Sequence, residues 1–410
     1  MTVRVAIAGA GLGGLCLAQG LRRAGIDVAV YERDDGLAGR RQGYRLHVDA
    51  RAGLALQQCL PPELLTLFQA SCAQPSTRLT VVSERLRVLN EITSDGPAID
   101  RYAPATLSTS VSRQTFREVL ATGLDDRIAF GSAVTGYDCD ENGVRVRFAD
   151  GRSAEADLLV GADGVGSAVR RQYLPHADPA DTGGRCIYGK TRVSPQTLSR
   201  LPVALSDGFT AVIGGKLGMA VGVVRFRNQV AGLGLSPADD YVMWGLTGKQ
   251  PDFGVTDASL SAMSPAELHA LSARLIRTWH PDLRALHAGA DVQETFLVRI
   301  RTAPPVPAWP PSRVTVLGDA IHVMSPAGGS GANIALKDAA LLSTVLARAV
   351  TDGGELTAAI GDYENQMRAY GYAAVAAAAE AEAARGTMRN PLLSWLYRRA
   401  GKARAHGARG

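Results

Sequence analysis

A glycine-rich turn near the amino terminus constrains the fold of this 410-residue chain most strongly. The segment from Val3 to Ala8 is nearly all apolar, and the turn Gly9-Ala10-Gly11-Leu12-Gly13-Gly14 follows it directly. A helical pattern then runs to Gly25, and a second apolar run occupies residues 28–31. A strand, a helix and a strand joined this closely are typical of a parallel β-α-β unit. The sequence therefore predicts an α/β protein.

The turn also has the spacing GxGxxG, in which each glycine has a physical task. Gly9 permits the tight turn, Gly11 lets the backbone approach a pyrophosphate, and Gly14 lets the helix pack on the strand. Glu32, at the end of the second strand, is placed to accept hydrogen bonds from ribose hydroxyls. This pattern predicts a dinucleotide site but does not distinguish NAD from FAD. The expected contacts are Gly9, Gly11, Leu12, Gly14, Glu32 and Arg33.

The predicted sheet is discontinuous in sequence, because another buried strand appears only at residues 314–317. Residues 186–246 are strand-like and rich in glycine, and a helix is expected over 265–279. We therefore predict a Rossmann-like domain formed by residues 1–178 and 290–350. Residues 179–289 are inserted in this domain, and we expect them to form a substrate domain built on a mainly antiparallel β-sheet. Residues 75–100 either belong to the Rossmann-like domain or join the substrate domain. Helices and a basic tail are expected over 351–410.

Charge and cysteine usage exclude several classes of function. The net charge of +5 comes from the tail, which holds seven Arg and Lys residues and no acidic residue from Arg385 onwards. The sequence contains no stripe of basic residues with interleaved aromatics, which is the pattern that would indicate nucleic-acid binding. The five cysteines are far apart and form no CxxC, which argues against a disulfide framework or a zinc site. With no signal-peptide pattern and no apolar run long enough for a membrane span, the sequence predicts a cytoplasmic protein.

Two later segments place an aspartate beside a glycine at the end of an apolar run. They are Asp157-Leu158-Leu159-Val160-Gly161-Ala162-Asp163-Gly164 and Val316-Leu317-Gly318-Asp319-Ala320-Ile321-His322. Together with the first glycine turn, they resemble the three ordered motifs of the group A FAD-dependent monooxygenases, the family of para-hydroxybenzoate and salicylate hydroxylases. The resemblance covers nearly the whole chain, since Tyr363-Glu364 and Arg368 resemble the closing helix of that family.

The resemblance implies a reaction and its cofactors. NADPH or NADH would visit transiently and reduce FAD, O2 would add at flavin C4a, and the hydroperoxide would pass one oxygen atom to an electron-rich organic substrate. The cofactor carries the difficult chemistry, while the protein supplies positioning, electrostatics and exclusion of water. We therefore expect a hydroxylase with a small-molecule substrate and O2 as its partners. An epoxidase or a Baeyer–Villiger enzyme on the same scaffold, and a non-catalytic protein that keeps FAD and sequesters a small molecule, stay open as alternatives.

The resemblance also implies roles for the residues around the flavin. Asp319 would accept hydrogen bonds from the ribityl hydroxyls, and the loop from Pro326 to Asn333 would pack against the ring with its N–H groups towards the N1 and C2=O edge. Asp319 as a helix cap and Asp163-Gly164 as a plain turn are the alternatives. The implied FAD contacts are Arg41, Arg113, Asp163, Gly164, Asp319, Gly329, Gly331, Ala332 and Asn333, and the implied catalytic positions are His47, Pro326 and Gly328.

His47 lies in the segment from Gly43 to Asp49, which resembles the family segment that lines the flavin and is more similar to the tetracycline-inactivating branch. It could handle protons or be fixed without titrating, whereas His322 is expected to be a satisfied histidine at a helix start. We expect a bulky, polycyclic natural product of secondary metabolism as substrate. Its wall should come from the inserted sheet, although alternation predicts that half or more of these positions face away. The candidates are Met219, Val221, Phe226, Met243 and Trp244.

Overall fold

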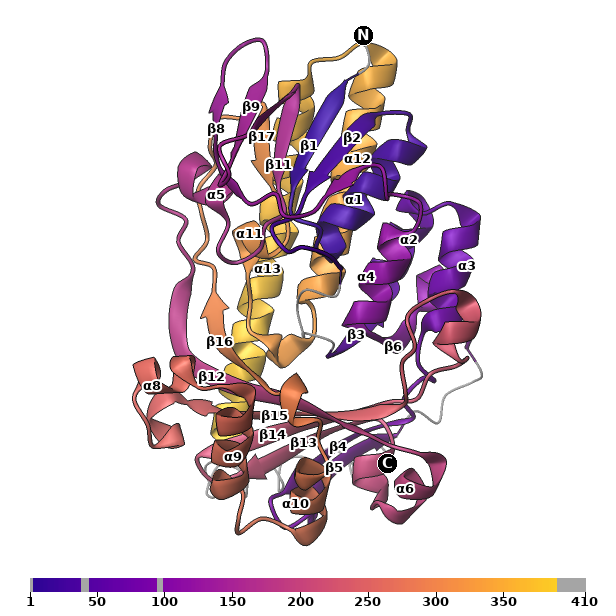
Figure 1. Cartoon of the computed structure of the whole chain (residues 1–410), viewed down its shortest axis with the longest axis vertical. Coiled ribbons are helices and arrows are strands. Elements are labelled where there is room, and N and C mark those ends of the chain that lie inside the picture. The colour runs from indigo at the N-terminus through magenta and orange to yellow at the C-terminus, as the bar shows by residue number, and fades with distance from the viewer. Residues whose placement is uncertain (1–2, 38–43, 94–98, 389–410) are drawn as a thin grey trace, which may run out of the picture.

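The computed structural model describes residues 3–37, 44–93 and 99–388, and it contains two bodies that are each built on one large sheet (Figure 1). The upper body in the figure holds a five-stranded parallel sheet, and the lower body holds a seven-stranded sheet. Arg41 and the basic tail from residue 389 onwards lie outside the described residues. Within the described ranges, no helix is long and apolar enough to cross a membrane.

The five-stranded sheet has the order β17-β11-β1-β2-β7, and its four neighbouring pairs are parallel. Its strands are β1 (Arg4–Ala8), β2 (Asp27–Tyr31), β7 (Ile128–Ala129), β11 (Leu158–Gly161) and β17 (Val314–Val316). The late strand β17 completes a sheet that begins with β1, because it pairs with β11. The predicted β-α-β start and the discontinuous sheet are therefore confirmed.

Helix α1 (Leu12–Arg23) is the central helix of this body, and every residue from Leu12 to Leu21 is buried. It packs against α2 (Ala50–Cys59), α4 (Arg113–Ala121) and α12 (Gly331–Asp352) as well as against the sheet. Helix α2 ends at Cys59 and α3 (Pro62–Ser71) follows it, because Pro61 and Pro62 interrupt the helical pattern between them. The apolar faces of these helices and strands form one continuous core.

The seven-stranded sheet has the order β16-β12-β15-β14-β13-β4-β5. It is antiparallel except for the β13–β4 pair, whose strands run parallel because β4 and β5 come from an earlier part of the chain. Its strands are β4 (Arg78–Ser83), β5 (Val88–Thr93), β12 (Ala180–Arg192), β13 (Phe209–Gly214), β14 (Leu217–Val224), β15 (Tyr241–Lys249) and β16 (Phe296–Thr302). The predicted fold class, an α/β protein with an inserted, mainly antiparallel sheet, is confirmed.

One face of this sheet is covered by α8 (Asp257–Ala262), α9 (Pro265–Leu275) and α10 (Pro281–Ala288), which bury a second core around Trp244 (Figure 1). The expected helix over 265–279 ends at Leu275, since the chain turns there before Pro281 starts α10. Two short helices, α6 (Pro195–Arg200) and α7 (Val203–Ser206), interrupt the segment that we expected to be strand-like.

Between the two bodies lies a two-stranded antiparallel ribbon of β3 (Arg45–Asp49) and β6 (Ser108–Ser112) (Figure 1). The last described helix, α13 (Leu356–Met388), extends from the upper body to the lower sheet, where Glu382 pairs with Lys249. This confirms the expected carboxy-terminal helical segment. The remaining regular elements are β8 (Val134–Cys139), β9 (Val144–Phe148), β10 (Ser153–Ala156), α5 (Ala168–Tyr173) and α11 (Asp319–His322), with short 3-10 turns between elements.

Candidate functional site

A cavity of about 1660 Å³ lies between the two bodies and is lined by residues of both. It extends from the glycine turn at Gly9 to the face of the seven-stranded sheet that α8 to α10 do not cover, at Met243. A pocket for one drug-sized ligand usually has a volume of about 300 to 1,000 Å³. This cavity is therefore large enough for a dinucleotide and a second organic molecule.

The glycine turn forms one end of the cavity, and its glycines differ in what surrounds them. Gly9 has a φ of +104°, and a Cβ atom on it would lie 2.5 Å from the carbonyl oxygen of Ala162. A Cβ on Gly14 would lie 2.2 Å from the Gly9 carbonyl oxygen, so both positions are closed to a side chain. A Cβ on Gly11 would meet nothing closer than 3.9 Å. The free space beside Gly11 faces the uncapped amino terminus of α1, where N–H groups and the helix dipole favour an anion.

Glu32 is held at this end by a buried ion pair. Its Oε2 atom accepts hydrogen bonds from the Ala10 backbone at 2.8 Å and from Arg117 Nη2 at 3.1 Å. Arg117 also donates from Nε to the Ala10 carbonyl at 2.8 Å. The neighbouring Arg33 lines the cavity with a largely exposed side chain that lies 3.7 Å from Asp34. Glu32 is therefore fixed in position by the turn and by α4.

Asp163 follows β11, and only one of its two carboxylate oxygens accepts a hydrogen bond from the described residues. Its Oδ2 atom accepts a hydrogen bond of 2.7 Å from the Ala168 backbone, near the start of α5. Its Oδ1 atom is buried without a hydrogen-bond partner. Gly164, which follows with a φ of +76°, lines the cavity together with Asp163. Both the turn and the unsatisfied atom are thus present at this position.

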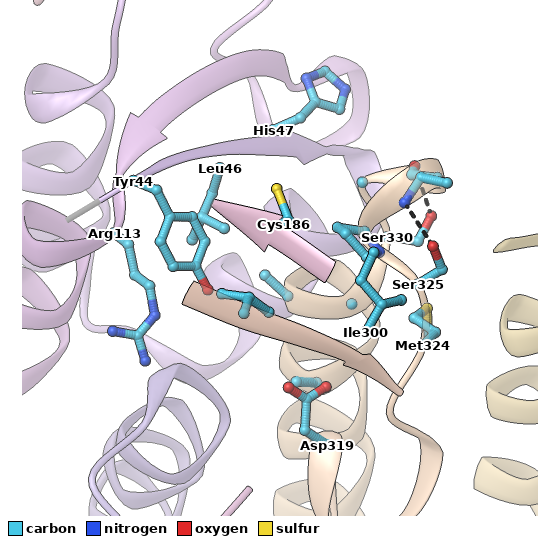
Figure 2. A pocket seen from close by; sticks show the side chains of 18 of the residues that line it. Tyr44, Leu46, His47, Arg113, Cys186, Ile300, Asp319, Met324, Ser325 and Ser330 are labelled. Carbon is cyan, nitrogen blue, oxygen red and sulfur yellow. Dashed lines mark hydrogen bonds between the residues drawn. The ribbon is translucent and has the colours of Figure 1, made fainter. Parts of the chain in front are cut away.

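Asp319 lies at the start of α11, with its carboxylate open to the cavity (Figure 2). Burial by the surrounding protein raises the pKa of this carboxyl group, although His322 and Arg113 act in the opposite direction. The preceding Gly318 has a φ of +60°, and its backbone N–H donates to Asp338 Oδ2 at 2.8 Å. The turn that presents Asp319 is therefore fixed from behind by the buried carboxylate of Asp338.

The loop from Pro326 to Ser330 connects this turn to α12. Its backbone reverses at Gly329, which has a φ of +61°, and the amino terminus of the long helix α12 has no side-chain cap. Gly328, Gly329, Gly331 and Ala332 all line the cavity. Free N–H groups at this helix start point to a site that favours negative charge.

Asn333 was expected to contact the cofactor, but it does not line the cavity, unlike Gly329, Gly331 and Ala332. Its Nδ2 atom donates to the carbonyl oxygens of His47, at 3.0 Å, and Gly329, at 3.1 Å, and its Oδ1 atom accepts from the Asp49 backbone at 3.0 Å. The side chain is fully buried, and all of these contacts are with backbone groups. Asn333 therefore braces the loop against β3 and does not line the cavity.

The ribbon strand β3 forms the wall opposite Asp319. In Figure 2 the side chains of Tyr44 and Leu46 extend from it towards Asp319, whereas the ring of His47 extends to the other side. Burial and the Arg45 guanidinium lower the pKa of His47, so the ring is mainly neutral at pH 7. Arg113 lies with its guanidinium 5.8 Å from the centre of the Tyr44 ring and lines the cavity. His322 lies outside the cavity lining, with Nε2 2.6 Å from Asp338 and Nδ1 buried without a partner.

Only some of the residues expected in the substrate wall line the cavity. Met219 and Met243 line it, but Met219, Val221 and Trp244 belong to the core on the helix-covered face. Val221 and Trp244 are opposite each other in register, so they point to the same side of the sheet. Phe226 lies beyond β14, where it packs near Ala73 and Tyr241. Other residues complete the wall, including Tyr44, Arg45, Cys186, Tyr188, Phe209, Ala220 and Gly245.

Comparison with known proteins agrees with this geometry. A family model for an FAD binding domain matches residues 284–378, and one for an NAD(P)-binding Rossmann-like domain matches residues 7–63. A solved structure from Photorhabdus luminescens, described as an FAD-containing monooxygenase, is 32% identical with a TM-score of 0.78, and the match covers 94% of this chain and 98% of that chain. The chain belongs to the group A FAD-dependent monooxygenases.

Other members of this monooxygenase family are similar over most of the chain. The dual O-methyltransferase/FAD-dependent monooxygenase elcB of Phaeosphaeria nodorum is 38% identical over 86% of this chain but over only 41% of its own length. The chain thus spans less than half the length of this relative. The aurachin C monooxygenase/isomerase of Stigmatella aurantiaca is 29% identical over 88% of this chain and 84% of its own length.

The described residues fit FAD, the cofactor of this monooxygenase family, on three observations. The space beside Gly11 can receive a diphosphate, the Asp319 carboxylate is open to the cavity, and the Oδ1 atom of Asp163 is buried without a partner. Arg117 is the functional candidate that the sequence reasoning missed. Its signal was its position one helical turn after Arg113, on the face of α4 that is directed at the glycine turn.

Proposed function

We propose that this chain is a monooxygenase that uses NAD(P)H to reduce FAD and inserts one oxygen atom of O2 into an aromatic or polycyclic organic substrate. One observation carries the proposal. A single cavity joins the Asp319 turn and the loop at Gly328, where the flavin would lie, to the apolar wall of the seven-stranded sheet at Met243. A substrate on that wall would therefore share one cavity with the reactive ring.

The glycine turn would hold the adenosine diphosphate half of FAD. The start of α1 beside Gly11 would receive the diphosphate, and Glu32 would accept hydrogen bonds from the ribose. The ion pair with Arg117 fixes the Glu32 carboxylate before binding, so little side-chain freedom is lost when the ribose arrives. Arg113 is placed to reach the phosphates or the ribityl chain from α4.

The turn at Asp319 would hold the ribityl chain and the ring. The Asp319 carboxylate would accept hydrogen bonds from the ribityl hydroxyl groups. These bonds stabilise the ionised carboxylate and so oppose the burial that raises its pKa. Pro326 and Gly328 would pack against the ring, with no side chain on the glycine to hold the backbone away. The uncapped start of α12 would favour the negative charge that reduction places on the ring edge.

When bound, FAD supplies the redox chemistry that accepts electrons from NAD(P)H and activates O2. The chain contributes to the exclusion of water, because two sheets, the β3–β6 ribbon and the end of α13 border the cavity. His47 is held mainly neutral by burial and by Arg45, which suits a side chain that packs rather than one that carries charge at pH 7. The substrate domain that we propose is the seven-stranded sheet with α6 to α10.

The proposal is tested with the purified chain. We expect a yellow flavin spectrum, NADPH or NADH oxidation stimulated by an aromatic ligand, and a product that gains one oxygen atom from labelled O2 by mass spectrometry. Asp319→Asn should lower the FAD content, whereas Asp352→Asn, at the exposed carboxyl end of α12, is the matched control. Stable FAD binding without reduction under any ligand would instead support a sequestration protein.

Epoxidation is a second candidate, since zeaxanthin epoxidase of Nicotiana plumbaginifolia is 27% identical over 90% of this chain. Hydroxylation and epoxidation add the same mass, so the two are separated by the position of the new oxygen in the product. An epoxide that opens to a diol in dilute acid would support this second function. A phenol that resists acid would support hydroxylation.

A further inference from the structure

Arg45 is a buried cation on the substrate side of the β3–β6 ribbon. It lies in β3 between Tyr44 and Leu46, which extend towards Asp319, so strand alternation directs Arg45 to the opposite side. There its guanidinium lies 5.5 Å from the centre of the Phe209 ring, on the seven-stranded sheet. It lines the same cavity as Phe209 and Met243.

The surrounding backbone leaves room for this arginine. A Cβ atom on Gly222 of β14 would lie 2.7 Å from Cδ and 3.2 Å from Nε of Arg45, so only glycine allows the side chain to lie across the strand. Its Nε atom is buried without a hydrogen-bond partner. Burial lowers the pKa of Arg45 to about 10, so the group stays protonated at pH 7.

The described part of the chain places no carboxylate within ion-pair distance of Arg45, in contrast to Arg78 and Lys249, which also line the cavity. Arg78 lies 2.9 Å from Glu91 and 3.4 Å from Asp207, and Lys249 lies 3.8 Å from Glu382. The groups that do face Arg45 are His47, whose pKa it lowers, and the Tyr241 hydroxyl. A buried charge without a partner is costly, which favours a ligand that supplies the opposite charge.

The aromatic wall of the same cavity also indicates the shape of that ligand. Tyr44 and Tyr188 stack with ring centres 5.6 Å apart, and Tyr188 stacks on Phe296 at 5.5 Å. Tyr44, Tyr188 and Phe209 line the cavity together with Met243 and Ala220. One cavity that holds flat aromatic surface and one buried guanidinium suits a planar aromatic molecule with an acidic oxygen atom.

We infer that Arg45 is a specificity-determining residue that binds an anionic oxygen, either a carboxylate or a phenolate, of an aromatic substrate. The inference rests on the proposed function, since it names the substrate class of that same site. Arg45 donates hydrogen bonds to the anion and fixes the orientation of the ring against Phe209. FAD binding depends on other residues, those at the glycine turn and at the Asp319 turn.

The test measures binding to the FAD-loaded protein by the change in the flavin absorption spectrum. The probes are 1-hydroxy-2-naphthoate, its methyl ester, which keeps the phenol, 1-methoxy-2-naphthoate, which keeps the carboxylate, and methyl 1-methoxy-2-naphthoate, which keeps neither acidic group and is the neutral reference. We expect the wild-type protein to bind at least one anionic probe about tenfold more tightly than its neutral analogue, as one charge-assisted contact would give. The ester and the ether separate the carboxylate from the phenolate.

Arg45→Met should abolish this preference for the anion and Arg45→Lys should keep part of it, while the FAD content stays as in the wild type. Gly222→Ala is a second variant that keeps the charge but displaces the arginine stem, and it should reduce the same preference. Equal binding of acidic and neutral probes by the wild type, no binding of any probe, or an unchanged preference in both Arg45→Met and Gly222→Ala would overturn the inference. Loss of FAD binding by the wild type would instead contradict the proposed function.

Discussion

The Nε2 atom of His322 lies 2.6 Å from Oδ2 of Asp338, in a part of the core where both side chains are almost fully buried. The same carboxylate accepts hydrogen bonds from the Gly318 backbone at 2.8 Å and from the Tyr370 hydroxyl at 2.7 Å. Three elements, α11, α12 and α13, are thus joined at one residue behind the turn that presents Asp319. The position of Asp319 therefore depends on a group that never reaches the cavity.

Replacing Asp338 by Asn should weaken both the fold and FAD binding. The variant leaves His322 without its anionic partner, and breaking a buried pair of this kind costs about 3 kcal/mol of unfolding free energy. We expect a lower urea midpoint and a lower FAD content at equal protein concentration. Asp362→Asn, on the exposed face of α13, is the control and should change neither quantity. Wild-type FAD content in Asp338→Asn would show that the turn is held by other contacts.

The same pair should make stability depend on pH. Burial by itself lowers the pKa of His322, but the Asp338 carboxylate raises it above the usual value of 6.5. The stabilisation is therefore complete below about pH 6.5 and is lost as the pH rises through the raised pKa. Urea unfolding of FAD-free protein should show a gap between wild type and His322→Gln that narrows from about pH 6 to pH 9. A gap that stays constant across this range would contradict a charged His322.

Gly11 and Gly9 should respond differently to alanine. A Cβ on Gly11 meets open space, and its φ of −76° suits any residue, so Gly11→Ala should fold normally but block the close approach of the FAD diphosphate. Gly9→Ala combines a φ of +104° with a contact of 2.5 Å and should lower stability itself. Thermal unfolding without FAD and FAD titration by fluorescence separate the two effects. Equal FAD affinity in Gly11→Ala and wild type would exclude a diphosphate at this position.

Arg117 and Glu32 form a pair in which each side chain is more than nine-tenths buried, with 3% and 6% exposure. Arg117→Met removes the Arg117 charge from beside the buried Glu32 carboxylate and should cost about 3 kcal/mol of unfolding free energy. The double variant Glu32→Gln with Arg117→Met removes both charges, so it should recover part of that loss. Chemical denaturation of the four proteins of this cycle measures the coupling. Additive losses would mean that the two charges do not stabilise each other.

The parts of the fold that were predictable from sequence are those in which a short segment determines its own structure. The turn from Gly9 to Gly14 and the strand before Asp319 are of this kind, because glycine spacing and continuous apolar runs report local backbone geometry. The pairing of β4 with β13 was not readable in this way. It joins residues 78–83 to 209–213, and no local pattern shows which distant strand will be the neighbour.

Sequence reasoning misplaced some of the site residues for a different reason. Both faces of β14 and β15 are apolar, one against α8 to α10 and the other against the cavity, so hydrophobic alternation could not show that Trp244 faces the core while Met243 faces the cavity. Arg45 was overlooked for the opposite reason. Its segment was recognised, but the absence of a counter-charge becomes visible only when the neighbouring strands are in place.

Glu364 of α13 should lower the stability of the protein near neutral pH. Its side chain is buried beneath β17, where the Thr315 hydroxyl donates to Oε1 at 2.8 Å. Burial raises its pKa from 4.5 to about 7, whereas the unfolded chain ionises near the usual value. The unfolded state therefore releases its proton first, and stability falls between about pH 4.5 and pH 7, by about 2 to 3 kcal/mol for this group. Glu364→Gln should remove that fall, which urea unfolding at several pH values would measure. If the variant loses stability with pH as steeply as the wild type over this range, Glu364 is not the group that titrates.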